Sequence, residues 1–322
     1  MDATLAPARR GLLATLLRRK EAAILIALLL LTLVIAVIAP RFVSGTNLYQ
    51  VSRQISFVAI VALGQLFVIL TGGIDLSVGS VMGWAGMVAA WAMVALGLPP
   101  VLAVLVGVAA GVAMGAINGS LIAYVKLPPF IATLGMLSFA YGLVLGLSKG
   151  WPITGLPRSF HWVAQGSILY LPVPVWIAVL LAVAAHVVLT YTAFGRRTYA
   201  IGGNEQATFL SGIDIDRIKF VLYMISAGLA AISGIVLTSR FGSAQPDTGK
   251  GWELDAIAAA VIGGTSLAGG SGTVLGVFIG ACIMGVLRSG LVMMGIDPYW
   301  HISIIGVVIV LAAVLDVKTK RT

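Results

Sequence analysis

The stretch Ala22-Ala-Ile-Leu-Ile-Ala-Leu-Leu-Leu-Leu-Thr-Leu-Val-Ile-Ala-Val-Ile-Ala39 decides the fold class. It contains no charged residue and no alternation of polar and apolar residues, which is typical of a helix that spans a bilayer and not of a barrel strand. The whole chain shares this character: of 322 residues, 60% are hydrophobic and only 10% are charged. Ordinary soluble domains carry about 25% charged residues. A water-soluble globular protein is therefore excluded.

Ten apolar segments predict an all-α, polytopic membrane protein of about ten transmembrane helices. The eighth segment is the shortest and follows a polar stretch, so two interpretations stay open: a full crossing, or a broken or re-entrant helix. We expect a transmembrane domain over residues 22–316, preceded by an N-terminal segment over 1–21 and followed by a tail over 317–322. The segments cover residues 22–39, 55–71, 78–96, 101–123, 130–147, 173–190, 220–238, 254–267, 273–292 and 301–315.

The basic residues predict how the chain lies in the membrane. Ten crossings place most of the Lys and Arg residues on the side of the two termini, and cytoplasmic segments are the ones enriched in these residues. We therefore expect a multi-pass membrane protein with both termini in the cytoplasm. The formal net charge is +9, but the basic residues flank apolar segments, which suits lipid headgroups and not nucleic acid. The cytoplasmic set is Arg9, Arg10, Arg18, Arg19, Lys20, Lys126, Arg196, Arg197, Arg217, Lys219, Lys318, Lys320 and Arg321.

A glycine signature occurs twice, as Gly72-Gly73-Ile74-Asp75-Leu76-Ser77-Val78-Gly79-Ser80 and as Gly263-Gly264-Thr265-Ser266-Leu267-Ala268-Gly269-Gly270-Ser271. Two glycines followed by Asp or Ser can end one helix and begin the next. In transporters, paired breaks in two halves of the chain indicate the substrate path. Close packing of helices is the alternative explanation. The candidate path residues are Gly72, Gly73, Asp75, Ser77, Gly263, Gly264 and Ser266.

Two charged residues near or inside apolar segments need an explanation, because charge at membrane depth is costly. Asp75 is expected to be the N-cap of the third segment, with a place on the solute path as the alternative. Arg288 lies near the outer end of the ninth segment, and we expect it to extend to the lipid headgroups. Lining the path is the alternative for Arg288.

The longest cytoplasmic connection, residues 192–219, is expected to contain a short helix. Asn204 is a favourable N-cap, Glu205 places negative charge at the positive end of the helix, and Gly212 suits the left-handed residue that ends it. So short a helix is not stable alone. It must pack against the membrane domain or against a separate cytoplasmic protein, and these residues alone leave both possibilities open.

No motif for chemistry or nucleotide binding is present. The sequence contains no G-x-x-x-x-G-K-[ST], no H-E-x-x-H, no G-x-S-x-G and no cluster of Cys and His residues, so we expect no catalytic residue, no metal and no cofactor. The single cysteine, Cys282, excludes an internal disulfide.

At Gly72–Gly79, Lys126–Gly135, Ala200–Glu205 and Ala259–Gly270, the chain resembles the ribose-type permeases of bacterial sugar ABC importers. The resemblance covers nearly the whole chain. It implies a permease of the bacterial inner membrane that works beside a second permease subunit, with a cytoplasmic ATP-binding subunit and a periplasmic sugar-binding protein. It also implies that the capped helix is the element that touches the ATPase, with Gly202, Gly203, Asn204, Glu205 and Gly212 as its residues.

The leading hypothesis is therefore a subunit that imports a monosaccharide, a ribose-like pentose or a hexose. An ion-coupled secondary transporter is the alternative, although such proteins usually carry more intramembrane acidic residues or histidines than this chain does. A passive channel or a membrane scaffold is a third possibility. The sequence does not name the sugar, and it leaves a homodimer and a heterodimer equally possible.

Overall fold

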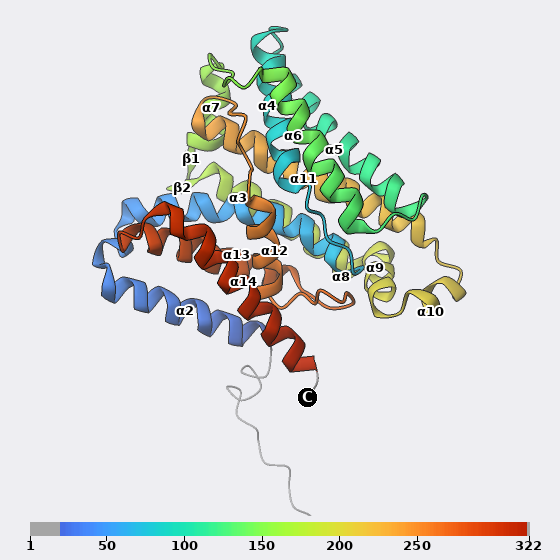
Figure 1. The fold of residues 1–322 in the computed structure, drawn as a ribbon. Helices are drawn as coiled ribbons and strands as arrows, with labels where there is room; N and C mark the ends of the chain where they lie inside the picture. The colour runs from blue at the N-terminus through green and yellow to red at the C-terminus, as the bar shows by residue number, and fades with distance from the viewer. Residues whose placement is uncertain (1–19, 321–322) are drawn as a thin grey trace, which may run out of the picture.

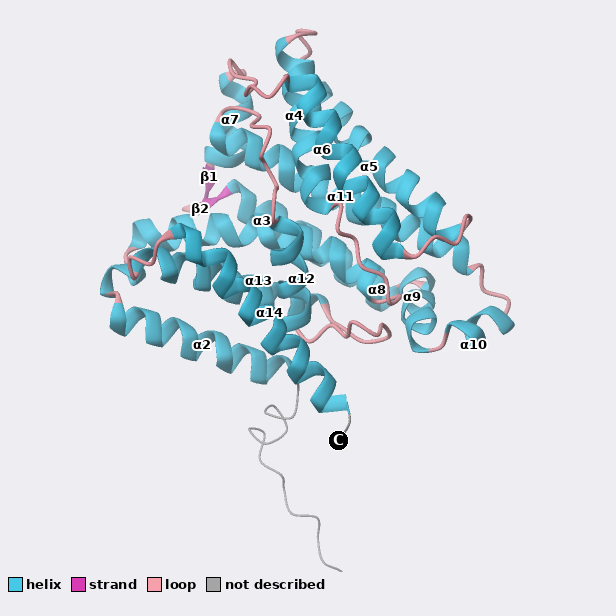
Figure 2. Cartoon of the chain, in the orientation of Figure 1, coloured by secondary structure: helices cyan, strands magenta, loops and turns pink. Residues whose placement is uncertain are grey.

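The computed structural model describes residues 20–320 and consists almost entirely of helices (Figures 1 and 2). Its one sheet in this range is a short antiparallel hairpin that pairs Ile168 with Leu171. The expected all-α polytopic fold is confirmed, while residues 1–19 and 321–322 of the expected terminal segments lie outside the described range. The elements are α2 (Lys20–Ile38), the 3-10 helix η1 (Pro40–Val43), α3 (Gly45–Ile69), α4 (Val78–Val94), α5 (Pro100–Ala123), α6 (Pro129–Ser148), α7 (Arg158–Gln165), β1 (Ser167–Ile168), β2 (Leu171–Pro172), α8 (Val173–Tyr191), α9 (Ala193–Gly203), α10 (Glu205–Leu210), α11 (Ile215–Phe241), α12 (Trp252–Ile262), α13 (Val274–Met293) and α14 (Pro298–Lys320).

Each of the ten predicted segments corresponds to a helix, but the helices differ in length. Within the described residues, seven are long and apolar enough to cross a membrane: α2, α3, α5, α6, α8, α11 and α13. Helix α12 has only 11 residues, a length of about 16 Å at 1.5 Å per residue. Since the hydrocarbon layer is about 30 Å thick, α12 alone cannot cross it, which favours the broken-helix interpretation of segment 254–267.

Several predicted boundaries need correction: α11 begins at Ile215 instead of residue 220, and α14 ends at Lys320 instead of residue 315. Helix α3 begins at Gly45 instead of residue 55, because the Ser44 side chain caps it by accepting a hydrogen bond from the amide of Asn47. Helix α12 ends at Ile262 instead of residue 267, because Gly263 is already its C-cap. Helix α7 and the β1–β2 hairpin were not anticipated from the sequence.

Helices α3, α11 and α13 form the centre of the bundle. About 78%, 67% and 67% of their most apolar stretches are buried, against 6% for α2 and 28% each for α5, α6 and α8. Helix α11 packs against α3, α4 and α5. Small residues allow this close approach: a Cβ atom added at Gly119 of α5 would lie 2.8 Å from the carbonyl oxygen of Phe220 in α11.

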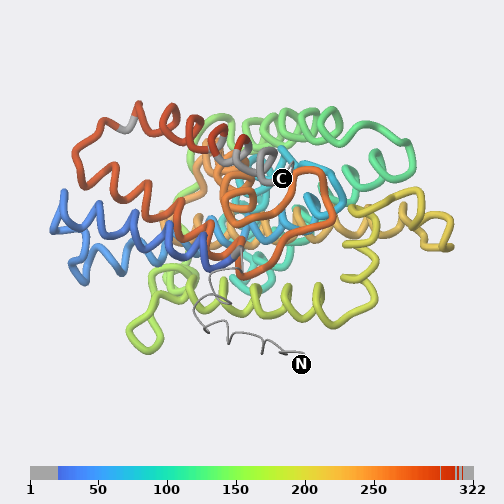
Figure 3. The backbone as a smooth tube through the Cα atoms, turned by 90° about the horizontal axis from the view of Figure 1, so that it is seen from below, coloured from blue at the N-terminus to red at the C-terminus, as the bar shows by residue number. Residues whose placement is uncertain are grey.

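The elements outside the long helices gather at opposite ends of the molecule. Helix α7 and the hairpin lie at one end, and α9 and α10 lie at the other, which we call the α10 end (Figure 1). Seen from below, α8 and α14 run along opposite sides of the bundle (Figure 3). The segment with the expected capped helix therefore projects from one end of a helical bundle.

Candidate functional site

Both copies of the glycine signature interrupt a helix, as the sequence predicts. In the first copy, α3 ends at Ile69 and α4 begins at Val78, and the chain turns at Gly72 with a φ of +76°. In the second copy, α12 ends at Ile262 and α13 begins at Val274, and Gly264 has a φ of +83°. Glycine adopts such left-handed angles at little cost.

The two breaks contact each other directly through their backbones. The amide of Gly270 donates a hydrogen bond of 2.9 Å to the carbonyl oxygen of Leu70. A Cβ atom added at Gly269 would lie 3.0 Å from the nitrogen of Gly72. Segments far apart in the sequence therefore form one structural unit.

Helix α9 packs against this unit at Gly202. A Cβ atom at Gly202 would overlap both the carbonyl oxygen of Leu70 and the amide nitrogen of Gly270. We call the five residues Leu70, Gly72, Gly202, Gly269 and Gly270 the glycine junction. Through it, the segment between α8 and α11 contacts both helix breaks at once, with no side chain between the backbones.

A second contact attaches α9 to the second break. The hydroxyl of Tyr199 donates a hydrogen bond of 2.7 Å to the carbonyl oxygen of Gly272. Burial raises the pKa of Tyr199 above its usual value, so this phenol stays protonated and remains a donor. Helix α9 therefore cannot move away from the break without losing this bond.

The expected capped helix is α10, and its prediction is confirmed. The Asn204 side chain accepts a hydrogen bond of 2.9 Å from the amide of Ala207, and Gly212 follows the helix with a φ of +77°. The carboxylate of Glu205 does not point away from the protein: it accepts a hydrogen bond of 2.8 Å from the Lys219 ammonium of α11. Phe209 and Leu210 are 69% and 78% exposed beyond it.

Asp75 is fully buried and binds the first break to α11. Its Oδ1 atom accepts hydrogen bonds from the amide and the hydroxyl of Ser77, at 3.0 and 2.6 Å, and its Oδ2 atom accepts one of 3.0 Å from the hydroxyl of Ser226. Gln65 of α3 bonds the Asp75 backbone from the other side. The expectation that Asp75 is the N-cap of α4 was wrong, because Ser77 occupies that position.

Replacing Ser226 with Ala is expected to lower the free energy of unfolding by about 1–3 kcal/mol, because a buried carboxylate oxygen loses its donor. Unfolding in mixed detergent micelles measures this change. Ser138→Ala is the matched control: the Ser138 hydroxyl is exposed and contacts the carbonyl of Leu134 in its own helix, so its effect should stay within about 0.5 kcal/mol. Equal changes in the free energy of unfolding for Ser226→Ala and Ser138→Ala would show that the hydrogen bond between Ser226 and Asp75 does not stabilise the fold.

The structure also contains a buried ion pair that the sequence analysis missed. Arg288 of α13 does not extend to the headgroups, as was expected: its Nη2 atom lies 2.5 Å from Oδ2 of Asp255 in α12. The Asp255 side chain is only 2% exposed. The available signal was a carboxylate at the second position of the short apolar segment 254–267, because a buried Asp requires a positively charged partner.

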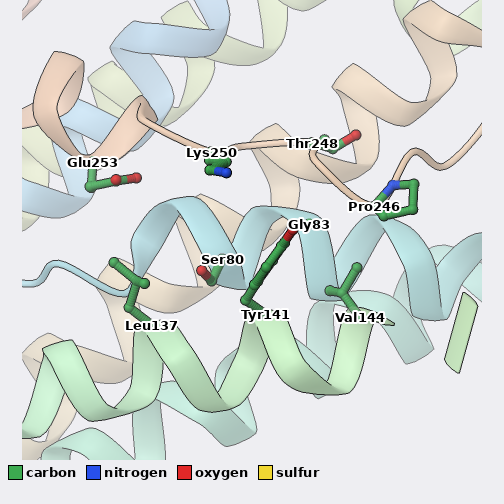
Figure 4. Close-up of a pocket in the computed structure, with 9 residues that line it drawn as sticks. All are labelled: Ser80, Gly83, Leu137, Tyr141, Val144, Pro246, Thr248, Lys250 and Glu253. Atoms are coloured by element: carbon green, nitrogen blue, oxygen red, sulfur yellow. The ribbon is translucent and has the colours of Figure 1, made fainter. Parts of the chain in front are cut away.

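Two cavities lie near the first break. One is a small pocket of about 70 Å³ between α4, α6, the segment before α12 and the start of α12, and Ser80, Tyr141 and Glu253 are among the residues that line it (Figure 4). The other is at the α10 end and measures about 320 Å³; we call it the α10-side cavity. Its lining residues are Thr71, Gly72, Gly73, Ile122, Lys126, Leu127, Pro128, Pro129, Glu205, Lys219 and Tyr223.

The candidate path residues divide into two groups. Gly72 and Gly73 line the α10-side cavity. Asp75, Ser77, Gly263, Gly264 and Ser266 line neither cavity, and all of these except Gly264 are buried. Along residues 20–320, no group of three His, Cys, Asp or Glu side chains could hold a metal ion.

Comparisons with known proteins identify the family. The model of the family described as "Branched-chain amino acid transport system / permease component" matches residues 47–313. The ribose import permease protein RbsC of Bacillus subtilis (strain 168) is 43% identical over 91% of this chain and 91% of its own. RbsC of Escherichia coli (strain K12) is also 43% identical, over 92% of this chain and 93% of its own.

A more distant relative has another sugar in its name. The xylose transport system permease protein XylH of Escherichia coli (strain K12) is 37% identical over 87% of each chain. No solved structure matches the chain. The chain therefore belongs to the family of transport-system permease components that includes these ribose and xylose permeases, and it is a multi-pass membrane protein.

Proposed function

We propose that this chain is the membrane-spanning subunit through which a monosaccharide enters the cytoplasm, driven by a separate ATP-binding subunit. The ribose and xylose permeases that it is similar to support a pentose or hexose as the solute. The observation that carries the proposal is the glycine junction, because it connects the segment that projects from the bundle to both helix breaks. The chain needs no ATPase site of its own in this scheme, and no cofactor.

The α10 end is assigned to the cytoplasm. Four basic residues of α9 and of the first turns of α11, with Lys126 beside them, belong to this end, and cytoplasmic segments are the ones enriched in Lys and Arg. In this orientation a periplasmic sugar-binding protein would meet the α7 end. A second permease subunit, identical or related, would complete the transporter in the lipid. The four residues are Arg196, Arg197, Arg217 and Lys219.

The energy for import then has to come from the partner. Moving a two-state gate from 1:99 to 99:1 takes about 5.5 kcal/mol of differential binding, which closure of ATP-bound subunits on α10 can supply. The glycine junction would pass this movement to the breaks. Within the breaks, we assign Gly72 and Gly73 to the path itself, and Asp75, Ser77, Gly263, Gly264 and Ser266 to maintaining the shape of the breaks.

Reconstitution into vesicles tests the proposal. Vesicles that contain the purified chain, with the ATP-binding subunit and the sugar-binding protein of the same transporter, should take up D-ribose, D-xylose or D-allose only when ATP is present on the side of the ATP-binding subunit. Uptake by this chain alone, driven by a proton or sodium gradient, would contradict the proposal and support a secondary transporter. Flux that is indifferent to both ATP and gradients would support a channel.

Phe209 and Leu210 are expected to form the contact with the ATP-binding subunit, because both apolar side chains are largely exposed on a helix that we assign to the cytoplasm. Changing both to Ser should reduce the ATP-binding subunit that co-purifies by about tenfold or more. Leu169→Ser with Tyr170→Ser is the matched control, since these residues are 77% and 97% exposed at the opposite end. If the amount of ATP-binding subunit that co-purifies is unchanged when Phe209 and Leu210 are both replaced by Ser, α10 is not part of the interface.

A further inference from the structure

Tyr223 lines the α10-side cavity, and within residues 20–320 its hydroxyl has no hydrogen-bond partner. Tyr223 is only 1% exposed, and its oxygen atom is buried. By contrast, the hydroxyl of Tyr199 donates to the carbonyl of Gly272. A buried hydroxyl without a partner costs about 1–3 kcal/mol, so native proteins usually satisfy it with protein, water or ligand. The cavity beside it is the place from which a partner can come.

The groups around this hydroxyl suit a neutral solute with many hydroxyls. Lys219 lies one helical turn before Tyr223 on α11, and its ammonium pairs with Glu205 at 2.8 Å. Lys126, on another wall, pairs with Asp216 at 2.5 Å. Both lysines are thus neutralised by a carboxylate, so the cavity offers donors and acceptors without a large net charge.

The remaining walls of the α10-side cavity consist mainly of apolar side chains and of residues from the first helix break. Ile122, Leu127, Pro128 and Pro129 face the cavity on one side, and Thr71, Gly72 and Gly73 of the first break face it on another. The carbon faces of a sugar can lie against such side chains while its hydroxyls reach polar groups. The volume of about 320 Å³ falls at the lower end of the range of about 300–1,000 Å³ that is typical of small-molecule sites.

We propose that the α10-side cavity is the site from which the monosaccharide is released into the cytoplasm, with the Tyr223 hydroxyl and the Glu205–Lys219 pair as its polar contacts. This inference rests on the proposed function and gives Glu205 a different role from the one that the resemblance implies. Its carboxylate contacts the release site, while Phe209 and Leu210 contact the ATPase. Because Glu205 belongs to α10, a movement of α10 changes the release site directly.

Protection of an introduced cysteine tests the proposal in the assembled transporter. With Cys282 replaced by Ala, Thr71→Cys places a thiol at the cavity wall, and Ser211→Cys places one on the exposed surface just after α10. Saturating D-ribose should slow the reaction of Thr71→Cys with a small thiol reagent about tenfold, and should leave Ser211→Cys unchanged.

Tyr223→Phe then tests the polar contact. The hydroxyl has no hydrogen-bond partner among the described residues, so a merely structural residue would tolerate its loss, and the free energy of unfolding should not fall. Losing one hydrogen bond to the sugar should raise the D-ribose concentration that gives half-protection by about three- to tenfold. Tyr124→Phe, an exposed tyrosine that does not line this cavity, is the control and should change nothing. Association with the ATP-binding subunit should be unchanged in both variants.

The outcomes separate this inference from the proposed function. The release site lies elsewhere, and the proposed function stands, if the transporter takes up D-ribose but D-ribose does not protect Thr71→Cys. The same conclusion follows if Tyr223→Phe leaves the D-ribose concentration for half-protection unchanged. If the assembled transporter takes up none of D-ribose, D-xylose and D-allose, the proposed function fails and the release site fails with it.

Discussion

Gly202→Ala is expected to reduce ATP-dependent sugar uptake by about tenfold or more, although it adds a single methyl group. The new Cβ atom would overlap the carbonyl oxygen of Leu70 and the amide of Gly270, and neither is a flexible side chain that can move aside. Inserting a methyl group into so tight a contact costs about 1–3 kcal/mol. Helix α9 must separate from the two breaks, and the bond between Tyr199 and Gly272 weakens with it.

The adjacent glycine provides the control. A Cβ atom at Gly203 would meet nothing within 4 Å, and Ala is favoured over Gly within a helix by about 1 kcal/mol. Gly203→Ala should therefore transport like the parent chain. Uptake assays with both variants, at matched amounts in the membrane, decide the question: equal uptake by Gly202→Ala and Gly203→Ala would show that the glycine junction has no part in transport.

Arg288→Met is expected to lower the free energy of unfolding by about 3–5 kcal/mol, because it leaves the carboxylate of Asp255 buried without its counter-charge. The side chain of Asp255 is 2% exposed, and its Oδ1 atom has no hydrogen-bond partner in the described part of the chain. The ion pair joins α13 to α12, a helix too short to cross the bilayer alone.

A double-mutant cycle in mixed detergent micelles measures the pair. Adding Asp255→Asn to Arg288→Met should restore most of the lost free energy, because the uncompensated charge is removed. Arg197→Met, at an exposed position of α9, should stay within about 0.5 kcal/mol of the parent chain. A loss of less than about 1 kcal/mol in the free energy of unfolding for Arg288→Met would contradict the buried ion pair. It would favour the alternative in which Arg288 extends to the lipid headgroups.

The sequence predicts the helices of this fold well because apolar segments of bilayer length have few alternative structures in lipid. It also predicts the helix breaks, since Gly72 and Gly264 adopt backbone angles that other residues avoid. The cap of α10 follows from local rules for the same reason: the Asn204 side chain bonds an amide only three residues away.

The contacts between distant segments could not be predicted in this way. No local pattern indicates that Gly202 meets Leu70, or that Glu205 pairs with Lys219 instead of a partner protein. Asp75 and Arg288 were each considered beside their own helix ends, whereas their partners, Ser226 and Asp255, come from other helices. The chemistry of a buried charge indicates that a partner exists, and only the three-dimensional fold identifies it.

We infer that α9 and α10 are the cytoplasmic segment through which an ATP-driven partner protein moves the two helix breaks. The most direct measurement is the labelling of Gln206→Cys, an exposed position of α10, in the Cys282→Ala background with a thiol reagent that cannot cross membranes. The account predicts no labelling in intact cells, rapid labelling in inside-out vesicles, and protection there by the bound ATP-binding subunit. Rapid labelling of Gln206→Cys from outside intact cells would contradict it.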